Sequence, residues 1–286
     1  MKAELIADYQ CEVGEGPLWH PMEKRVYWTD IKQGRMFRYD PLAEIHDQFY
    51  EGAMVGGFTI QADGSLLLFM EEGAIAIWRE GTLTYIIDKI PGEQNNRFND
   101  VIADPAGRVF CGMMRLDEQS GGKLYRLDTD GSIKVVIEKV QLSNGMAFTG
   151  DKRHMYYTDS LARQIYVFDY DESNGSITNQ NVFLKIPDET TIPDGMTLDA
   201  EDYVWSARWD GWSLFRYAPD GSDDRQIRLP AKQVSSLTFG GDDYTDIYVT
   251  TAGGQDKANN GSGAGALFRI RSGIKGKPEF LSKIGM

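Results

Sequence analysis

Cysteine and histidine, which bind metals through sulfur or nitrogen, are scarce in this chain. Among its 286 residues there are two cysteines, Cys11 and Cys111, and three histidines, His20, His46 and His154. Two cysteines cannot build a disulfide framework. Because this low number is typical of proteins in a reducing compartment, we expect a cytoplasmic protein. Neither H-x-x-x-H nor C-x-x-C occurs in the sequence, which therefore offers no zinc site made of adjacent ligands.

Basic residues and long apolar runs are also in short supply. Thirty Lys and Arg residues stand against 43 Asp and Glu residues, which gives a formal net charge of −13. This balance leaves no general basic surface for a nucleic acid and favours cations over anionic polymers. No segment approaches the roughly 18 consecutive apolar residues of a membrane span, and Asp8 precedes any apolar run. We expect no nucleic-acid partner, no membrane span, no signal peptide and no obligate protein partner.

Glycine and aromatic residues are plentiful, with 31 Gly, 14 Tyr, 13 Phe and 6 Trp. Short segments such as residues 26–30 and 155–159 are rich in aromatic and β-branched residues, and turns rich in Asp and Gly separate such segments. These features are strand and hairpin signals, and helical periodicity of useful length is absent. The sequence therefore predicts an all-β protein.

One sequence unit occurs six times along the chain. Its first residues are Glu15, Gly56, Asn99, Asn144, Asp194 and Ser235. Successive first residues are 41, 43, 45, 50 and 41 positions apart, and each unit contains about four strand-like segments. A period in the forties with four strands is typical of a propeller blade. We predict a six-bladed β-propeller that forms one domain over residues 1–286, with residues 2–6 as an outer strand of the last blade.

The first residues of the units predict a metal site in the central channel. The innermost strand of each blade lines that channel, so equivalent positions face it at similar heights. Glu15 and Asp194 supply carboxylates, Asn99 and Asn144 supply amides, and Ser235 supplies a hydroxyl. Oxygen donors of this kind suit one divalent cation, with Ca²⁺ favoured, Mg²⁺ or Mn²⁺ possible on the same donors, and Zn²⁺ less favoured.

Arg97 precedes the channel position Asn99 by two residues. Side chains two apart on a strand share one face, so both could reach the same ligand at the channel mouth. The alternative is that Arg97 is a solvated cation or the partner of a carboxylate.

Four motifs in this chain resemble those of the gluconolactonase/regucalcin (senescence marker protein) family and occur in the family's order. They are Glu-Gly-Pro at 15–17, Arg-Phe-Asn-Asp at 97–100, Ser-Asn-Gly-Met-Ala-Phe at 143–148, and Pro-Asp-Gly-Met at 193–196. The resemblance extends from about residue 10 to the last blade. It implies a lactonase with a divalent cation in the propeller channel.

The resemblance also implies a role for each matching residue. The family's metal ligands fall on Glu15, Asn144 and Asp194, and its substrate-contacting Arg and Asn fall on Arg97 and Asn99. A further acidic substrate contact would fall on Asp117, where the regucalcin-like branch usually has Glu. Three of the residues singled out by the repeat alone are thus the ones that the family uses for its metal.

Together, the repeat, the channel residues and the resemblance predict a metal-dependent hydrolase of cyclic esters, most simply of a sugar lactone. The cation would polarise the lactone carbonyl, and Asp194 would act as the general base for the attacking water. One alternative is a metal-dependent esterase or phosphotriesterase, which an apolar entrance rich in Trp and Met would favour. Another is a non-catalytic calcium-binding propeller, because propellers support many functions.

Overall fold

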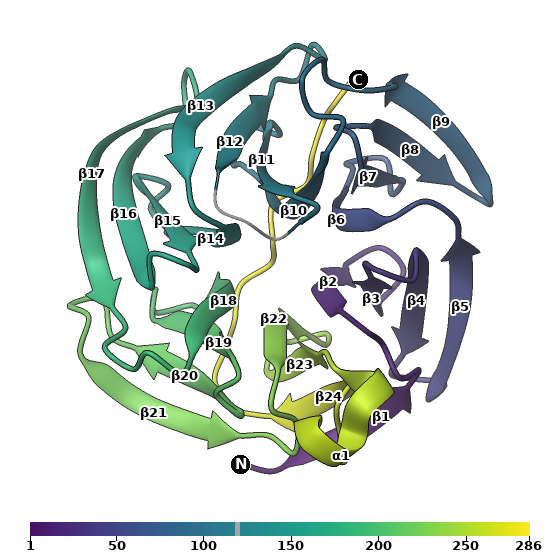
Figure 1. Cartoon of the computed structure of the whole chain (residues 1–286), viewed down its shortest axis with the longest axis vertical. Coiled ribbons are helices and arrows are strands. Elements are labelled where there is room, and N and C mark those ends of the chain that lie inside the picture. Colours follow the sequence, from purple (N-terminus) through teal and green to yellow (C-terminus); the bar gives the residue numbers. More distant parts are fainter. Residues whose placement is uncertain (118–120) are drawn as a thin grey trace.

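The chain folds into six antiparallel sheets that surround a central channel (Figure 1). The computed structural model describes residues 1–117 and 121–286, and within them 24 strands form six sheets of four strands each. The predicted six-bladed β-propeller is therefore confirmed. No helix in the described ranges is both long enough and apolar enough to cross a bilayer.

In the first three blades the strands follow one another from the channel to the rim. Blade 1 consists of β2 (Gly14–His20), β3 (Arg25–Asp30), β4 (Arg35–Asp40) and β5 (Ile45–Glu51). Blade 2 consists of β6 (Val55–Ile60), β7 (Leu66–Met70), β8 (Ile75–Arg79) and β9 (Thr82–Ile87). Blade 3 consists of β10 (Asn96–Ala103), β11 (Val109–Arg115), β12 (Gly122–Leu127) and β13 (Ile133–Val140).

Blades 4 and 5 repeat this order, and the last blade closes the ring. Blade 4 consists of β14 (Ser143–Phe148), β15 (His154–Asp159), β16 (Gln164–Asp171) and β17 (Ser176–Lys185). Blade 5 consists of β18 (Ile192–Leu198), β19 (Val204–Trp209), β20 (Ser213–Tyr217) and β21 (Asp223–Arg228). Blade 6 consists of β22 (Val234–Gly240), β23 (Asp246–Thr251), β24 (Ala266–Arg271) and, outermost, β1 (Ala3–Asp8).

The N-terminal strand confirms the predicted closure, because β1 pairs antiparallel with β24 from Ala3↔Ile270 to Asp8↔Ala266. This pairing covers the edge that β24 would otherwise expose. Between β23 and β24 the chain forms a 3₁₀ turn, η1 (Gly254–Asp256), and a short helix, α1 (Lys257–Asn260). Both lie on one face of the ring (Figure 1).

The core lies between the faces of neighbouring blades. In one cluster, Leu67 and Phe69 from blade 2 pack with Phe98 and Cys111 from blade 3. The innermost strands and their neighbours are buried, whereas outer strands such as β9 are largely exposed. Burial on both faces explains why inner strands such as β6 and β7 consist almost entirely of apolar or small residues.

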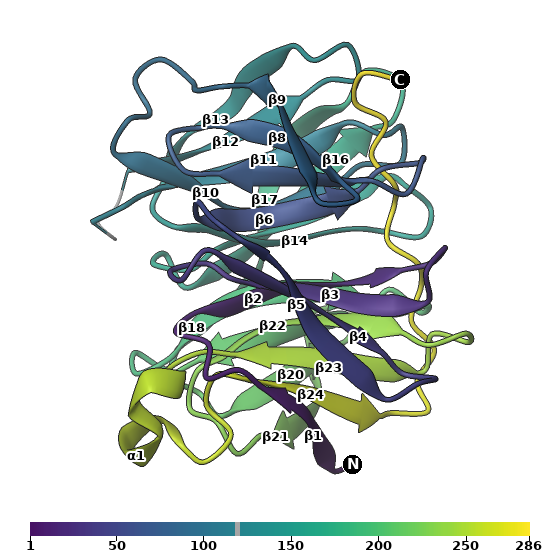
Figure 2. The same cartoon turned by 90° about the vertical axis from the view of Figure 1, so that its right-hand side faces the viewer.

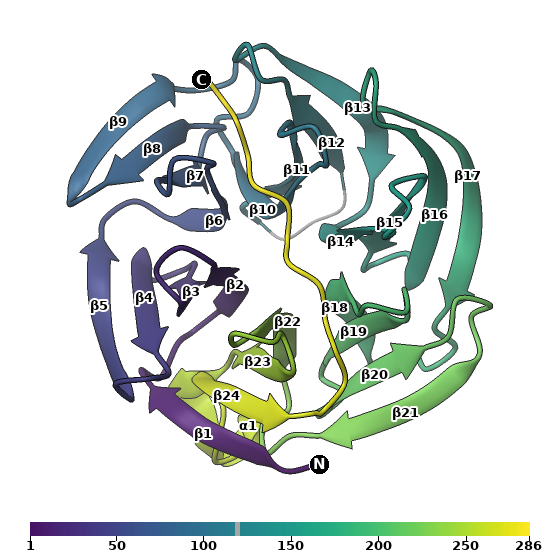
Figure 3. The same cartoon turned by 180° about the vertical axis from the view of Figure 1, so that it is seen from behind.

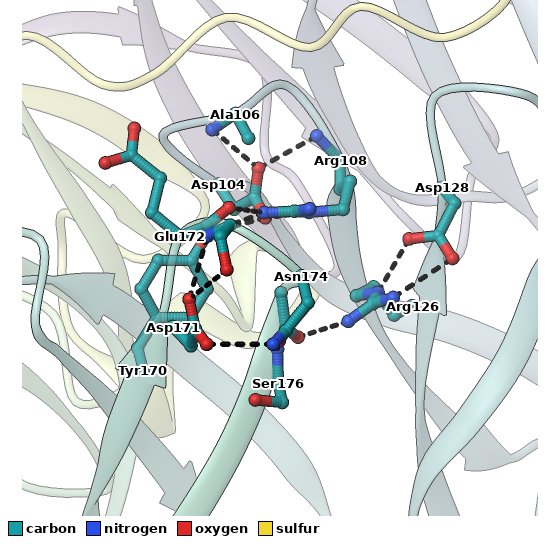
Figure 4. Close-up of polar contacts among 12 residues, drawn as sticks. Asp104, Ala106, Arg108, Arg126, Asp128, Tyr170, Asp171, Glu172, Asn174 and Ser176 are labelled. Carbon is teal, nitrogen blue, oxygen red and sulfur yellow. Dashed lines mark hydrogen bonds and ion pairs between the residues drawn. The ribbon is translucent and has the colours of Figure 1, made fainter.

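A polar cluster joins the β10–β11 turn of blade 3 to β16 of blade 4 (Figure 4). The carboxylate of Asp104 accepts hydrogen bonds from the Tyr170 hydroxyl at 2.7 Å and from Arg108 Nε at 2.6 Å. Both oxygens of Asp104 are thereby occupied, since backbone amides of the same turn also donate to it. The cluster ties the two blades together by hydrogen bonds as well as by apolar packing.

The C-terminal segment after β24 runs across the face opposite α1 (Figures 2 and 3). It hydrogen-bonds to five blades in turn, through Tyr244, Ala200, Phe148, Ile60 and Gly107. It crosses the end of the channel on that face. The cavity that holds the predicted site residues lies at the other end, where residues of η1 and α1 line it.

Candidate active site

A cavity of about 430 Å³ lies at the mouth of the channel, on the face that carries α1. Five of the predicted site residues line it: Glu15, Arg97, Asn99, Asn144 and Asp194. They come from the innermost strands of blades 1, 3, 4 and 5, and each is at most 8% exposed. The structure therefore brings together side chains that are up to 179 positions apart in the sequence (194 − 15).

Bulges in the innermost strands direct these side chains into the channel. The pairing register shifts between Glu15 and Leu18 in blade 1, and between Pro193 and Met196 in blade 5. Blades 2, 3, 4 and 6 have a register shift at the equivalent place. A bulge breaks the alternation of a strand and re-aims its side chain. Sequence reasoning missed these bulges, although the Asn-Gly and Asp-Gly pairs of blades 4 and 5 fall inside them.

Three carboxylates with raised pKa values interact with one another and with Arg97. Glu15 and Asp194 line the cavity, whereas Asp100 lines a second pocket of the channel. Burial raises the pKa of Glu15 well above its ordinary value, and Asp194 and Asp100 raise it further. Burial and Asp100 likewise raise the pKa of Asp194. Burial raises the pKa of Asp100 itself to about 7. The positive charge of Arg97 acts to lower the pKa values of all three carboxylates. With all three carboxylates ionised, one arginine leaves two negative charges without a counter-charge, which suits a divalent cation.

The amide of Asn144 has an oxygen without a partner. Its Nδ2 donates a hydrogen bond to Ser160 Oγ at 3.0 Å, whereas its buried Oδ1 has no hydrogen-bond partner among the described residues. A buried acceptor without a partner costs free energy unless a ligand satisfies it. This oxygen is thus a donor atom available to a cation.

Arg97 and Asn99 lie together, as their spacing predicts. Arg97 Nη1 donates to Asn99 Oδ1 at 2.7 Å and to the Phe98 carbonyl at 2.9 Å. Asn99 Nδ2 in turn donates to the Ser143 carbonyl of blade 4 at 2.9 Å. The guanidinium is therefore held over the base of the cavity by its own strand and by the neighbouring blade.

A buried glutamate anchors the loop that leads to Arg97. The Glu93 carboxylate accepts hydrogen bonds from the Tyr125 hydroxyl at 2.5 Å and from Lys123 Nζ at 2.7 Å, and also from the side chain of Asn96. Lys123 and Tyr125 belong to β12, so the loop is fixed against the body of blade 3. The sequence contained no signal for this contact, because its partners are about 30 residues away.

Asp117 lies apart from the other predicted residues. It is exposed, does not line the cavity, and forms a two-pronged ion pair with Arg115, with N–O distances of 2.9 and 2.6 Å. Residues 118–120, which come next in the sequence, lie outside the described ranges. A substrate-contacting role for Asp117 stays a prediction.

The cavity has an apolar wall and a polar wall. The apolar wall comes from blades 3, 4 and 5 and consists of Met114, Leu142, Leu161, Ile192 and Trp209. The polar wall comes from blades 6 and 1 and includes Lys32, Gln233, Gln255, Asp256 and Asn260. Such a cavity suits a small molecule with one apolar side and several polar groups.

The donor set fits a hard cation better than zinc. In the described part of the chain, no group of three or more His, Cys, Asp and Glu residues is placed to hold a metal. The candidate ligands are instead two carboxylates, of Glu15 and Asp194, and the amide oxygen of Asn144. Oxygen donors that include an amide are typical of Ca²⁺ sites.

The fold and the site together define a six-bladed propeller with a buried, acidic pocket at the mouth of its channel. Comparison with known families agrees with this class: the family model for the SMP-30/Gluconolactonase/LRE-like region matches residues 13–253. The chain belongs to this family, which confirms the resemblance seen in the four motifs.

Relatives with a similar sequence cover the whole chain. The pentonolactonase XacC of Haloferax volcanii is 44% identical over 294 residues, which is 99% of each chain. Regucalcin of Gallus gallus is 32% identical, and the match covers 98% of each chain. Among solved structures, a luciferin-regenerating enzyme superposes with a TM-score of 0.91 at 29% identity, over 99% of each chain. A calcium-binding regucalcin from Agrobacterium tumefaciens also has a TM-score of 0.91, at 22% identity over 99% of this chain and 98% of that one, which shows the shared fold.

Proposed function

We propose that this protein is a lactonase that uses a divalent cation to open sugar lactones. The observation that carries the proposal is the convergence of Glu15, Asn144 and Asp194 on one buried cavity, beside Arg97 and Asn99. Membership of the family and the similarity to a pentonolactonase support the lactone as substrate. The clustering of three carboxylates with a single arginine, together with the unpartnered Asn144 oxygen, supports the cation, with Ca²⁺ as first choice.

In this proposal, Glu15, Asn144 and Asp194 hold the cation, which when bound supplies Lewis-acid polarisation of a carbonyl. Asp194 takes a proton from the water that attacks the carbonyl carbon. The bond between that carbon and the ring oxygen then breaks, and the ring oxygen receives the proton. Arg97 and Asn99 orient oxygen atoms of the substrate, so that the carbonyl lies within reach of the water.

The test is a substrate panel run on metal-stripped protein, with Ca²⁺, Mn²⁺, Mg²⁺ or Zn²⁺ added back separately. We expect the stripped protein to be inactive on pentono- and hexonolactones, and one or more of the cations to restore turnover. Equal rates for the stripped and the loaded protein would contradict a role for the cation.

The apolar wall favours a second candidate function, the hydrolysis of non-sugar esters or phosphotriesters. Met114, Leu161 and Trp209 would support an aryl or acyl group better than a hydroxylated ring. Adding an aryl ester and an aryl phosphotriester to the panel separates the two candidates by kcat/KM. Cation binding without turnover of any substrate would instead indicate the non-catalytic calcium-binding propeller.

A further inference from the structure

The hydroxyl of Ser160 links two of the candidate metal ligands. Ser160 follows β15 and is fully buried. Its Oγ donates a hydrogen bond to the Pro193 carbonyl at 2.6 Å and accepts one from Asn144 Nδ2 at 3.0 Å. Pro193 directly precedes Asp194 in blade 5, so one hydroxyl connects the Asn144 amide of blade 4 with the backbone that carries Asp194.

This arrangement helps to determine which end of the Asn144 amide faces the cavity, together with a hydrogen bond from the same amide that lowers the pKa of Asp194. A carbonyl oxygen only accepts hydrogen bonds, so the single hydroxyl proton of Ser160 is committed to Pro193. Ser160 can then only accept from Asn144, and the amide must turn its nitrogen toward the serine. Its oxygen is left pointing away from Ser160, buried and without a partner in the described chain.

The repeat allows the same position to be compared in another blade. Gly14 pairs with Asp30 in blade 1, as Ser143 pairs with Asp159 in blade 4. The next residue, Ile31 in blade 1 and Ser160 in blade 4, donates its backbone N–H to Val13 and Leu142 respectively, at 2.9 and 3.0 Å. The two positions are therefore equivalent.

Blade 1 places a fully buried isoleucine, Ile31, where blade 4 has Ser160. The channel residue of blade 1 is the carboxylate Glu15, either oxygen of which can bind a cation. The channel residue of blade 4 is an amide with only one ligating end. Of these two blades, the hydroxyl thus occurs in the one whose channel residue is an amide, which packing alone does not require.

We propose that Ser160 is a positioning residue that fixes the Asn144 amide with its oxygen toward the cation and sets its place relative to Asp194. The inference rests on one part of the proposed function, namely that a divalent cation binds at this site. Removing such an outer partner of a metal ligand typically weakens metal affinity by about 10- to 100-fold.

The first experiment measures Ca²⁺ binding to the metal-stripped full-length protein by isothermal titration calorimetry. For Ser160→Ala we expect a Kd about 10- to 100-fold higher than that of the wild type. The matched control is Ser213→Ala, because Ser213 is a buried serine on β20 whose Oγ accepts an amide hydrogen bond from Gln226 at 2.8 Å. We expect this control to leave the Kd unchanged.

A double-mutant cycle separates orientation from general stability. In Asn144→Asp the carboxylate presents an oxygen in either orientation, so adding Ser160→Ala should change the Kd by no more than about twofold. The melting temperatures of wild type and Ser160→Ala, both measured in EDTA, show whether Ser160 stabilises the fold in the absence of metal. An unchanged Kd for Ser160→Ala, or the same loss in both backgrounds, would overturn the inference while leaving the proposed function standing. A wild type that binds no divalent cation would overturn the proposed function itself.

Discussion

Gly195, the residue after Asp194, lies where two innermost strands approach closely. A Cβ added to Gly195 would lie 2.2 Å from Ser236 Oγ and 2.6 Å from Ser236 Cβ, in the neighbouring blade. The strand β18 would have to move away from β22 to make room. Asp194 would move with it, so the glycine in this Asp-Gly pair also positions the proposed general base.

For Gly195→Ala we expect the free energy of unfolding to fall by about 1–3 kcal/mol, as for other overpacked sites. Urea denaturation of the two proteins measures this difference. The control is Gly150→Ala on an exposed turn, where the nearest atom to the new Cβ is a carboxylate oxygen of Asp202 at 3.5 Å. Equal losses for both variants would mean that the contact with Ser236 is not the cause.

Asp194 carries the chemical step in the proposed mechanism. Asp194→Asn keeps the shape of the side chain but cannot take a proton from water. We expect kcat to fall by about 10²- to 10⁴-fold. Circular dichroism and the melting temperature check that the fold is intact, and Ca²⁺ titration shows whether the cation still binds. A variant that binds Ca²⁺ and turns over at the wild-type rate would remove Asp194 from the role of base.

At the scale of the element, the loop before β10 is the segment that delivers Arg97 to the cavity. Burial raises the pKa of Glu93, but the hydrogen bonds from Lys123, Tyr125 and Asn96 outweigh it and hold that pKa below its ordinary value of 4.5. A lowered folded-state pKa contributes stability that is present above the unfolded pKa and is lost as the pH falls through the folded pKa.

We therefore expect the free energy of unfolding of the wild type to fall more steeply than that of Glu93→Gln as the pH drops from about 5 to about 3, through the ordinary pKa and the lowered folded-state pKa. Denaturation curves across this range measure the slopes. The control is Glu44→Gln on an exposed turn, which should keep the wild-type slope. Because Glu93 anchors the segment that delivers Arg97, Glu93→Gln should also raise KM for a lactone more than it lowers kcat.

At the scale of the whole molecule, the two chain ends hold the ring together in different ways. β1 completes the sheet of blade 6, whereas the C-terminal segment crosses the opposite face and bonds to five blades. Within that segment, Gly276 donates to the Tyr244 carbonyl at 2.7 Å and Ser282 donates to the Ile60 carbonyl at 2.9 Å. The segment thus links blades 6 and 2, which are not neighbours in the ring.

Deleting residues 274–286 removes these links and opens the channel end opposite the cavity. Several backbone hydrogen bonds are lost, each contributing on the order of 1 kcal/mol, so we expect the melting temperature to fall by roughly 10 °C. Thermal unfolding followed by circular dichroism measures the shift. Deleting Met286 alone is the control. An unchanged melting temperature for the longer deletion would show that the blades hold the ring without this segment.

The number of blades could be predicted from the sequence because each blade repeats the same pattern of burial. The spacing of the six units and their aromatic, β-branched strands reflect that pattern directly. The same alignment pointed to Glu15, Asn144 and Asp194, since equivalent positions in a symmetric ring meet at one axis. Comparison with known families confirmed the family that the four motifs indicated.

Only the tertiary structure decided how those side chains are aimed and supported. Bulges, the hydroxyl of Ser160 and the anchor at Glu93 depend on contacts between strands or blades that are far apart in the chain, and a local pattern cannot encode such contacts. The exposed position of Asp117 and the division of the cavity into an apolar and a polar wall also follow from the packing of blades around the channel. The periodicity of the sequence indicates which residues face inward, whereas the packing of the blades sets the distances between their side chains and the orientation of each side chain inside the ring.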